Sequence, residues 1–267
     1  MHVERFESAL WQTTSLLLVA DGEAVAVDPC ISRSEVSRIR DRSDELGVAV
    51  THVLVTHADW DHVCGIAAFP GAVAAMGEAT ARIVESGAPA QELTEQAAAY
   101  GVDVYQPPRV DRALAPSGAH QIGAFVVETL PLRGHTVDGT GYRVRALDLL
   151  AVGDHLSPVE FPFASSSTAD YRTTLAGLVD LLEDDPPAQV YPGHGRPLTA
   201  GEALEIARQD LAYLRELHDA MSAALAGGTT ESARDAGRAV RPPRGAPSDL
   251  AGELAGNVEA QLAELLA

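Results

Sequence analysis

The segment from residue 56 to residue 62 concentrates side chains that bind metal ions. In single letters it reads THADWDH, so two imidazoles and two carboxylates lie within six positions. Imidazole nitrogens and carboxylate oxygens are both ligands of divalent transition metals. The segment directly follows the apolar run at residues 53–55, which predicts a strand that ends in a ligand-dense loop.

Three further positions downstream pair a glycine with a metal-ligating side chain. They are Gly134-His135, Gly153-Asp154 and Gly193-His194, and each follows a run that predicts a strand. Side chains at strand ends are rigidly placed, and small neighbours let backbone and metal approach closely. Together the four motifs predict a two-metal hydrolase, because paired cations can share a hydroxide, lower its pKa and polarise the bond that it attacks.

The elements that must position these motifs alternate between strands and helices. Residues 16–20 and 24–28 predict a hairpin, and residues 51–56 predict a buried strand. Capping signals and apolar spacing predict helices over 34–46, 167–182 and 199–225. This alternation indicates an α/β fold built in layers.

The middle of the chain divides into a helical and a β-like part. Residues 78–100 predict a helix that is broken near residues 87–89. Glycine and proline then separate three β-like runs, at 102–105, 125–130 and 146–152.

The C-terminal part predicts a helical extension. Residues 241–247 contain three prolines and predict a linker or extended arm. A final amphipathic helix is predicted by apolar residues spaced by four, namely Leu250, Leu254, Val258, Leu262 and Leu266. We expect this helix to pack on the body rather than to form a dimer contact. We therefore divide the chain into a catalytic domain, 1–200, and a helical extension, 201–267, that packs on it.

The composition argues against several partners. Nineteen Lys and Arg face 38 Asp and Glu, which gives a formal net charge of −19. Nucleic acid and anionic membranes are therefore not expected as partners.

There is no basic segment followed by an apolar core at the N-terminus and no apolar stretch near about 20 residues, so neither a signal peptide nor a membrane span is expected. Cys30 and Cys64 fit reduced thiols, and we expect a cytoplasmic protein.

The ordered motifs resemble those of the metallo-β-lactamase superfamily. Its pattern His-x-His-x-Asp-His, followed by a distant His, a distant Asp and a last His, corresponds to residues 57–62, His135, Asp154 and His194. The resemblance covers roughly residues 10–200. It implies a four-layer αββα sandwich with the metals at one edge of the paired sheets.

The resemblance also implies a ligand set for two metals. The first metal would take His57, Asp59 and His135. The second would take Asp61, His62 and His194, and Asp154 would bridge the two.

Position 59 departs from the family pattern, because Asp59 stands where the family has histidine. An anionic oxygen in place of an imidazole makes the first site harder. This shifts the expectation from two zinc ions toward iron or manganese, as in the flavodiiron proteins that carry a carboxylate there. A weak first site, with one metal sufficing, is the other possibility.

These observations predict a metal-dependent hydrolase of a small ester, thioester, lactone or amide. A metal-bound hydroxide would attack the carbonyl, and Asp61 would orient it and shuttle its proton. A di-iron oxidoreductase and a phosphodiesterase are alternatives on the same fold, and a non-enzymatic member is less favoured because all seven ligand positions carry competent donors. The partner is a small-molecule substrate, and a homodimer is possible.

Several neighbouring residues have two readings from the sequence. Asp28 either supports a metal-site loop or shapes a turn, and Trp60 either walls the pocket or shields the metals. Cys64 is expected to pack under the loop. Phe161 and Phe163 are candidates for an apolar pocket wall, whereas three tyrosines are expected to be structural rather than catalytic: Tyr142, Tyr171 and Tyr191.

Overall fold

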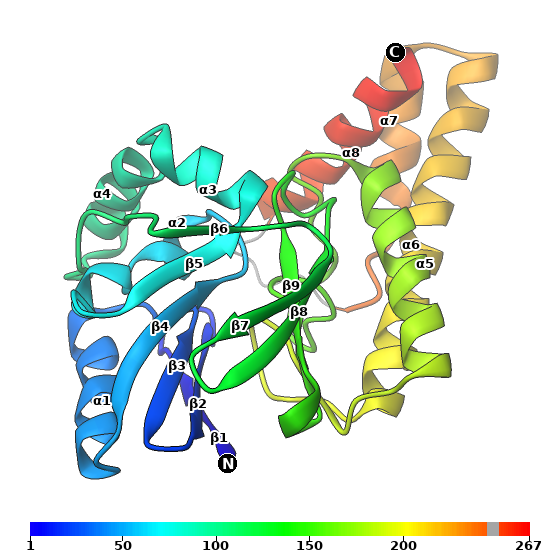
Figure 1. Ribbon diagram of the computed structural model, residues 1–267. Helices are drawn as coiled ribbons and strands as arrows, with labels where there is room; N and C mark the ends of the chain where they lie inside the picture. Colours follow the sequence, from blue (N-terminus) through cyan, green and yellow to red (C-terminus); the bar gives the residue numbers. More distant parts are fainter. Residues whose placement is uncertain (245–250) are drawn as a thin grey trace.

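Two β-sheets packed face to face form the centre of the computed structural model, which describes residues 1–244 and 251–267 (Figure 1). The first sheet has the order β1-β2-β3-β4-β5-β6 and the second has the order β11-β10-β9-β8-β7. The strands of the first sheet are β1 His2–Glu7, β2 Thr14–Ala20, β3 Glu23–Val27, β4 Ala49–Val55, β5 Val73–Gly77 and β6 Arg112–Leu114. Those of the second are β7 Gly118–Ile122, β8 Phe125–Pro131, β9 Thr140–Val144, β10 Leu149–Ala151 and β11 Gln189–Tyr191.

Helices cover the outer face of each sheet, which completes the four-layer αββα sandwich that the sequence predicted (Figure 1). The first half of the chain contributes α1 Arg33–Glu45, α2 Trp60–Val63, α3 Glu78–Glu85 and α4 Ala88–Tyr100. The second half contributes α5 Thr168–Asp184, α6 Ala200–Gly227, α7 Thr230–Ala239 and α8 Ala251–Leu266, and two short 3-10 helices, Ile66–Ala68 and Arg145–Leu147, lie in loops.

Strand β2 shows why its sequence suits the middle of this sandwich. All seven of its residues are buried, because both faces of the sheet are covered. Leu16 and Leu18 face the core between the sheets, whereas Leu17 and Val19 face the core under α1. The period of two places apolar side chains in both layers, so the apolar run reads as one continuous hydrophobic segment.

Most predicted elements occur close to their expected bounds. The hairpin of β2 and β3 is present, and the helix predicted over 78–100 is broken into α3 and α4. Ser167 and Thr199 cap α5 and α6, the latter with a complete capping box. The cap of α1 is Ser32 rather than Ser34, since Ser32 and Glu35 form the reciprocal box.

Two expectations for single segments were wrong. Residues 102–105 alternate like a strand, but they run as irregular backbone beside α4, where Val104 is buried against Leu93 and Ala97. Their apolar residues fill a small core rather than a sheet face. Conversely β1 was not predicted, although it pairs along its whole length with β2. Three of its six residues are charged, which suits an edge strand.

The C-terminal helix packs against the second half of the body. Leu254, Val258 and Leu262 of α8 join the core formed with α5 and α6, whereas the predicted core residue Leu266 is 59% exposed. Leu250 lies outside the described residues. Asn257 fixes the helix to the chain before α5: its amide oxygen accepts from the backbone N–H of Ala164 at 2.7 Å, and its amide nitrogen donates to the carbonyl of Pro162 at 2.8 Å.

We predict that Asn257→Ala destabilises the protein by about 2 kcal/mol, because a buried backbone donor and a buried acceptor lose their partners together. Urea denaturation followed by circular dichroism measures the effect. Glu259→Ala on the same helix is the control: its pair with Arg234 is exposed, so a change below about 1 kcal/mol is expected. Equal midpoints for the two variants would show that Asn257 does not anchor α8.

Candidate metal centre

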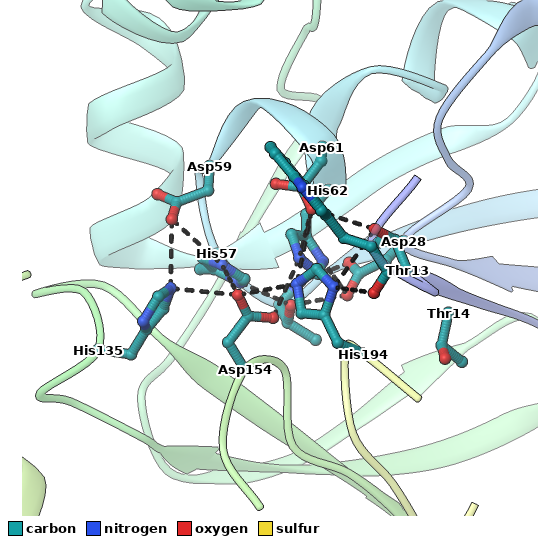
Figure 2. A network of polar contacts seen from close by, with 12 residues as sticks. Thr13, Thr14, Asp28, His57, Asp59, Asp61, His62, His135, Asp154 and His194 are labelled. Atoms are coloured by element: carbon teal, nitrogen blue, oxygen red, sulfur yellow. Dashed lines mark hydrogen bonds and ion pairs between the residues drawn. The ribbon is translucent and has the colours of Figure 1, made fainter. Parts of the chain in front are cut away.

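All seven predicted ligand side chains converge at one edge of the sandwich (Figure 2). They come from four loops or short helices that each follow a strand: the segment after β4, which includes α2, and the loops after β8, β10 and β11. The seven are His57, Asp59, Asp61, His62, His135, Asp154 and His194. No candidate group among the described residues includes the other histidines: His2, His52, His120, His155 and His218.

The donor atoms fall into groups at the spacing that one metal ion requires. His57, Asp59 and His135 form one group, and Asp61, His62 and His194 form another. In the first group the Oδ2 of Asp59 lies 3.3 Å from the Nε2 of His135 and 3.6 Å from the Nε2 of His57. Ligands bonded at about 2.1 Å to one tetrahedral ion lie about 3.4 Å apart. The side chains therefore fit a metal ion without rearrangement.

Asp154 lies between the two groups. Its Oδ1 is 3.1 Å from the Nε2 of His62, and its Oδ2 is 3.2 Å from the Nε2 atoms of both His135 and His194. Gly193 makes this position possible, because a Cβ there would come within 2.2 Å of the Asp154 carboxylate. One carboxylate can therefore touch both groups.

Each of the four histidines is held through Nδ1, which leaves Nε2 to face the centre. The Nδ1 of His135 donates to the carbonyl of Phe163 at 2.9 Å, and that of His194 donates to the carbonyl of Trp11 at 3.1 Å. The Nδ1 of His57 contacts the hydroxyl of Thr56 at 3.0 Å. Such partners fix the tautomer and the ring orientation of a metal-ligating histidine.

Asp28 contacts the residues that carry and orient the candidate ligands. Of the two roles that the sequence left open, the contacts favour support of a metal-site loop over the shaping of a turn. Its carboxylate accepts from the backbone N–H of Thr56 at 2.8 Å and from the Thr56 hydroxyl at 2.7 Å. The same carboxylate contacts the Nδ1 of His62 at 3.1 Å. Through Thr56 it also reaches His57, so one buried carboxylate orients two of the four rings.

The charges at this centre favour a cation. Burial opposes protonation of His57, but the carboxylates of Asp154 and Asp59 outweigh burial and raise the pKa of the ring to about 9. Burial likewise opposes protonation of His194, yet Asp154 and Glu160 raise its pKa to about 9. Positive charge is therefore stabilised here, whether it is a proton on a ring or a metal ion between the rings.

Unpaired buried atoms point to the same conclusion. Among the described residues, the Nε2 atoms of His57 and His62 and the Oδ1 of Asp154 are buried without a hydrogen-bond partner. Buried polar atoms are normally satisfied. All three atoms belong to candidate metal groups, so cations held among the donors would satisfy them.

Asp59 differs from the other ligands in its exposure. Its side chain is 38% exposed, against 2% for His57 and 7% for Asp61. The first group is therefore open toward solvent on the side of its carboxylate. This openness would let a substrate or water reach the first group more easily than the second.

The neighbouring residues follow the readings made from the sequence. Cys64 is buried against Trp60 rather than at the donors. Three tyrosines do not line the cavity, and their hydroxyls have acceptors of their own: Tyr142 donates to the carbonyl of Val55, Tyr171 to the carbonyl of Asp154 and Tyr191 to the side chain of Gln189. Burial lowers the pKa of His155 to about 3, and its ring packs on Tyr171 at 4.6 Å between centroids.

A cavity of about 220 Å³ opens onto five of the seven candidate ligands, all but His57 and His62. Phe161 and Phe163 line it, as predicted, and so does Trp60. The sequence did not point to the remaining side chains of its wall, which belong to segments far from the motifs: Trp11, Glu92, Gln96, Tyr100, Glu160 and Glu253. Thr13 was also missed. Its hydroxyl lies 3.4 Å from the Oδ2 of Asp61, and no motif marks it.

Comparison with known proteins agrees with this geometry. Residues 9–194 match the family model described as the metallo-beta-lactamase superfamily. Hydroxyacylglutathione hydrolase of Jannaschia sp. (strain CCS1) is 28% identical over 127 residues, which make up 48% of this chain and 42% of that protein. The chain therefore matches less than half the length of this curated relative.

Two solved structures show the extent of the fold. TTHA1429, a metallo-beta-lactamase family protein from Thermus thermophilus, has a TM-score of 0.68 at 20% identity, over 99% of this chain and 93% of that one. TTHA1623, solved in a di-iron-bound form, has a TM-score of 0.58 at 23% identity, over 76% of this chain and 96% of that one. The first alignment extends over the C-terminal helices.

We predict that Asp28→Asn weakens binding of a divalent metal by about 10- to 100-fold, because the amide cannot orient both Thr56 and His62 as the carboxylate does. Competition with a chromogenic chelator measures the affinity. Asp21→Asn is the matched control, since Asp21 is an exposed turn residue at φ 51° and asparagine tolerates that conformation. Equal affinities in the two variants would contradict the role of Asp28.

Proposed function

The chain belongs to the metallo-β-lactamase superfamily, and we propose that it is a metal-dependent hydrolase of a small ester, thioester, lactone or amide. The observation that supports this most is the convergence of the seven donors at one place, where five of them line one cavity. In a metal site that only stabilises a fold, protein ligands occupy every coordination position. Here an open side remains beside the partly exposed Asp59.

We assign the residues to two metal ions as follows. His57, Asp59 and His135 would hold one ion, Asp61, His62 and His194 would hold the other, and Asp154 would contact both. Divalent ions in these positions would supply a water of lowered pKa and a Lewis acid for the carbonyl oxygen.

The residues of the chain position and shield the reacting groups. Asp61 is held by the hydroxyl of Thr13 at 3.4 Å, so its carboxylate can orient an attacking water and accept its proton. Phe161 and Phe163 form an apolar wall that excludes bulk water and strengthens the electrostatics at the donors.

Asp59 supports a proposal about which metal binds. A carboxylate in the first group favours iron or manganese over zinc, and the neighbour solved in a di-iron form shows that this fold accommodates two irons. We propose that the first group prefers iron or manganese.

A di-iron oxidoreductase is the second candidate function, and Asp59 is the observation that favours it. Visible absorption bands that change with redox state would distinguish it from a hydrolase.

We also propose a cellular compartment for the protein. In the described residues no helix is long and apolar enough to cross a membrane, and Cys30 and Cys64 are buried free thiols. The free thiols support a reducing compartment such as the cytoplasm.

We predict that Asp61→Ala and His194→Ala each reduce hydrolysis of small thioesters by more than about 100-fold, since each removes a ligand whose metal supplies several kcal/mol to the transition state. Thiol release measures the rate, and circular dichroism checks the fold. His2→Ala is the control, because His2 is exposed and far from the donors in sequence. Rates equal to the unaltered enzyme in both variants would eliminate the assignment.

A separate prediction concerns Asp59→His. Replacing the carboxylate by an imidazole softens the first group, so the ratio of bound zinc to bound iron rises by about threefold or more in protein exposed to equal amounts of both metals. Elemental analysis measures the ratio. Asp41→His, at an exposed position of α1 outside the candidate groups, controls for added histidine. An unchanged ratio in Asp59→His would mean that position 59 does not set the metal preference.

A further inference from the structure

The cavity next to the metal-ligating side chains contains three aromatic rings that come from separate elements. Trp11 lies in the loop between β1 and β2, Trp60 lies in α2 and Tyr100 ends α4. The ring centroids of Trp60 and Tyr100 are 6.0 Å apart and nearly parallel, at 9°. The Trp11 ring stands across both, at 5.5 Å and 74° from Trp60 and at 4.8 Å and 81° from Tyr100. We call these three residues the aromatic cluster.

Such a cluster can bind a cation. A ring attracts a positive charge placed over a free face within about 6 Å of the centroid, and aromatic cages hold quaternary ammonium groups in this way. The three rings pack on one another at 4.8 to 6.0 Å, so a cation would bind on the outside of the cluster. Tyr100 is 47% exposed and is its accessible member, whereas Trp60 is buried.

Three carboxylates outside the proposed ligand set line the same cavity, namely those of Glu92, Glu160 and Glu253. Glu92 shares a face of α4 with Gln96 and Tyr100, because the three are spaced by four residues. Glu253 reaches the cavity from α8, and its Oε2 is buried without a hydrogen-bond partner among the described residues. A buried carboxylate oxygen without a donor can be stabilised by a cation or a ligand N–H nearby.

The balance of charge remains negative after metal binding. Three candidate ligand carboxylates together with Glu92 and Glu253 contribute five negative charges, and two divalent ions would contribute four positive ones, so a net charge of about −1 would remain near the cavity. Glu160 adds less than a full charge at neutral pH, because burial raises its pKa to about 7. None of the described residues that line the cavity is Lys or Arg. A substrate with carboxylates, such as a glutathione thioester, would therefore meet no cationic side chain in this lining.

We propose that the substrate carries a cationic nitrogen, as an ammonium or quaternary ammonium group, which binds between the aromatic cluster and the carboxylates of Glu92 and Glu253. The hydrolysable bond of the same molecule then lies over the metal-ligating side chains. This inference names the substrate class of the proposed hydrolase and rests on that function. The cation site itself can be tested without turnover.

Binding of choline to the metal-loaded full chain tests the site directly. The two tryptophans of the chain, Trp11 and Trp60, both line the cavity, so intrinsic fluorescence reports on it. We expect a saturable change with choline chloride at constant ionic strength, with an affinity about tenfold or more above that for the neutral isostere 3,3-dimethylbutan-1-ol. The double variant Glu92→Gln/Glu253→Gln should lose about tenfold in choline affinity.

Glu95→Gln is the matched control, because Glu95 lies on α4 but does not line the cavity. It should bind choline like the unaltered protein. Choline affinity no higher than that of the neutral alcohol, or unchanged in the double variant, would overturn the proposal. Thermal melts of the variants verify that they fold, and Glu92→Gln alone changes only an exposed residue of α4.

Turnover then separates the cation site from the proposed hydrolysis. Three thioesters are compared by thiol release: acetylthiocholine, the neutral S-(3,3-dimethylbutyl) thioacetate and the anionic S-acetyl-3-mercaptopropionate. We expect kcat/KM about tenfold or more higher for the cationic thioester than for the neutral one, and lowest for the anionic one. A preference for the anionic thioester would overturn the inference. If none is hydrolysed, thioesterase activity is contradicted, and the choline measurement alone decides whether the cation site exists.

Discussion

The carboxylate of Asp154 lies within 3.1 to 3.6 Å of the Nε2 atoms of four histidines, and much of the fold serves to hold that contact. Ionised groups are costly to bury unless they are paired. The arrangement is therefore tolerable only because each ring is oriented by a second partner through Nδ1, and because positive charge can enter among the donors. A helix or loop that shifted by about an ångström would leave one of these charges buried without compensation.

The two sheets bring the donors from distant parts of the sequence to one place around Asp154. The loops after β4, β8, β10 and β11 reach the same edge, although β4 belongs to one sheet and the other three strands belong to the second. Their separation in sequence does not matter, because the core between the sheets fixes the strands relative to one another. Close approach at the centre requires the absence of side chains, as at Gly193, where a Cβ would meet the Asp154 carboxylate at 2.2 Å. The motif glycines are thus part of the site.

Much of this could be predicted from the sequence, for identifiable reasons. Donor residues cluster at residues 57–62 and follow predicted strands, and the helix caps at Ser167 and Thr199 are local signals. Residues 102–105 were misjudged because a short apolar alternation fits either a strand or the edge of a small core, and only tertiary contacts decide. The role of Asp28 was left open for the same reason: its partners, Thr56 and His62, are 28 and 34 residues away.

Most of the cavity wall, apart from Phe161, Phe163 and Trp60, could not be predicted from the sequence because long-range packing assembles it. The same packing connects the C-terminal helices to the donors. Asn257 of α8 holds the backbone of Pro162 and Ala164, and the carbonyl of the intervening Phe163 accepts from the Nδ1 of His135. The α8 helix therefore acts on the orientation of one ring at the centre through a single buried amide. The same helix brings Glu253 to the cavity, so the segment that closes the pocket also shapes its charge. A C-terminal extension that only added stability would need neither contact, so α8 takes part in shaping the cavity while the strand ends hold the donors.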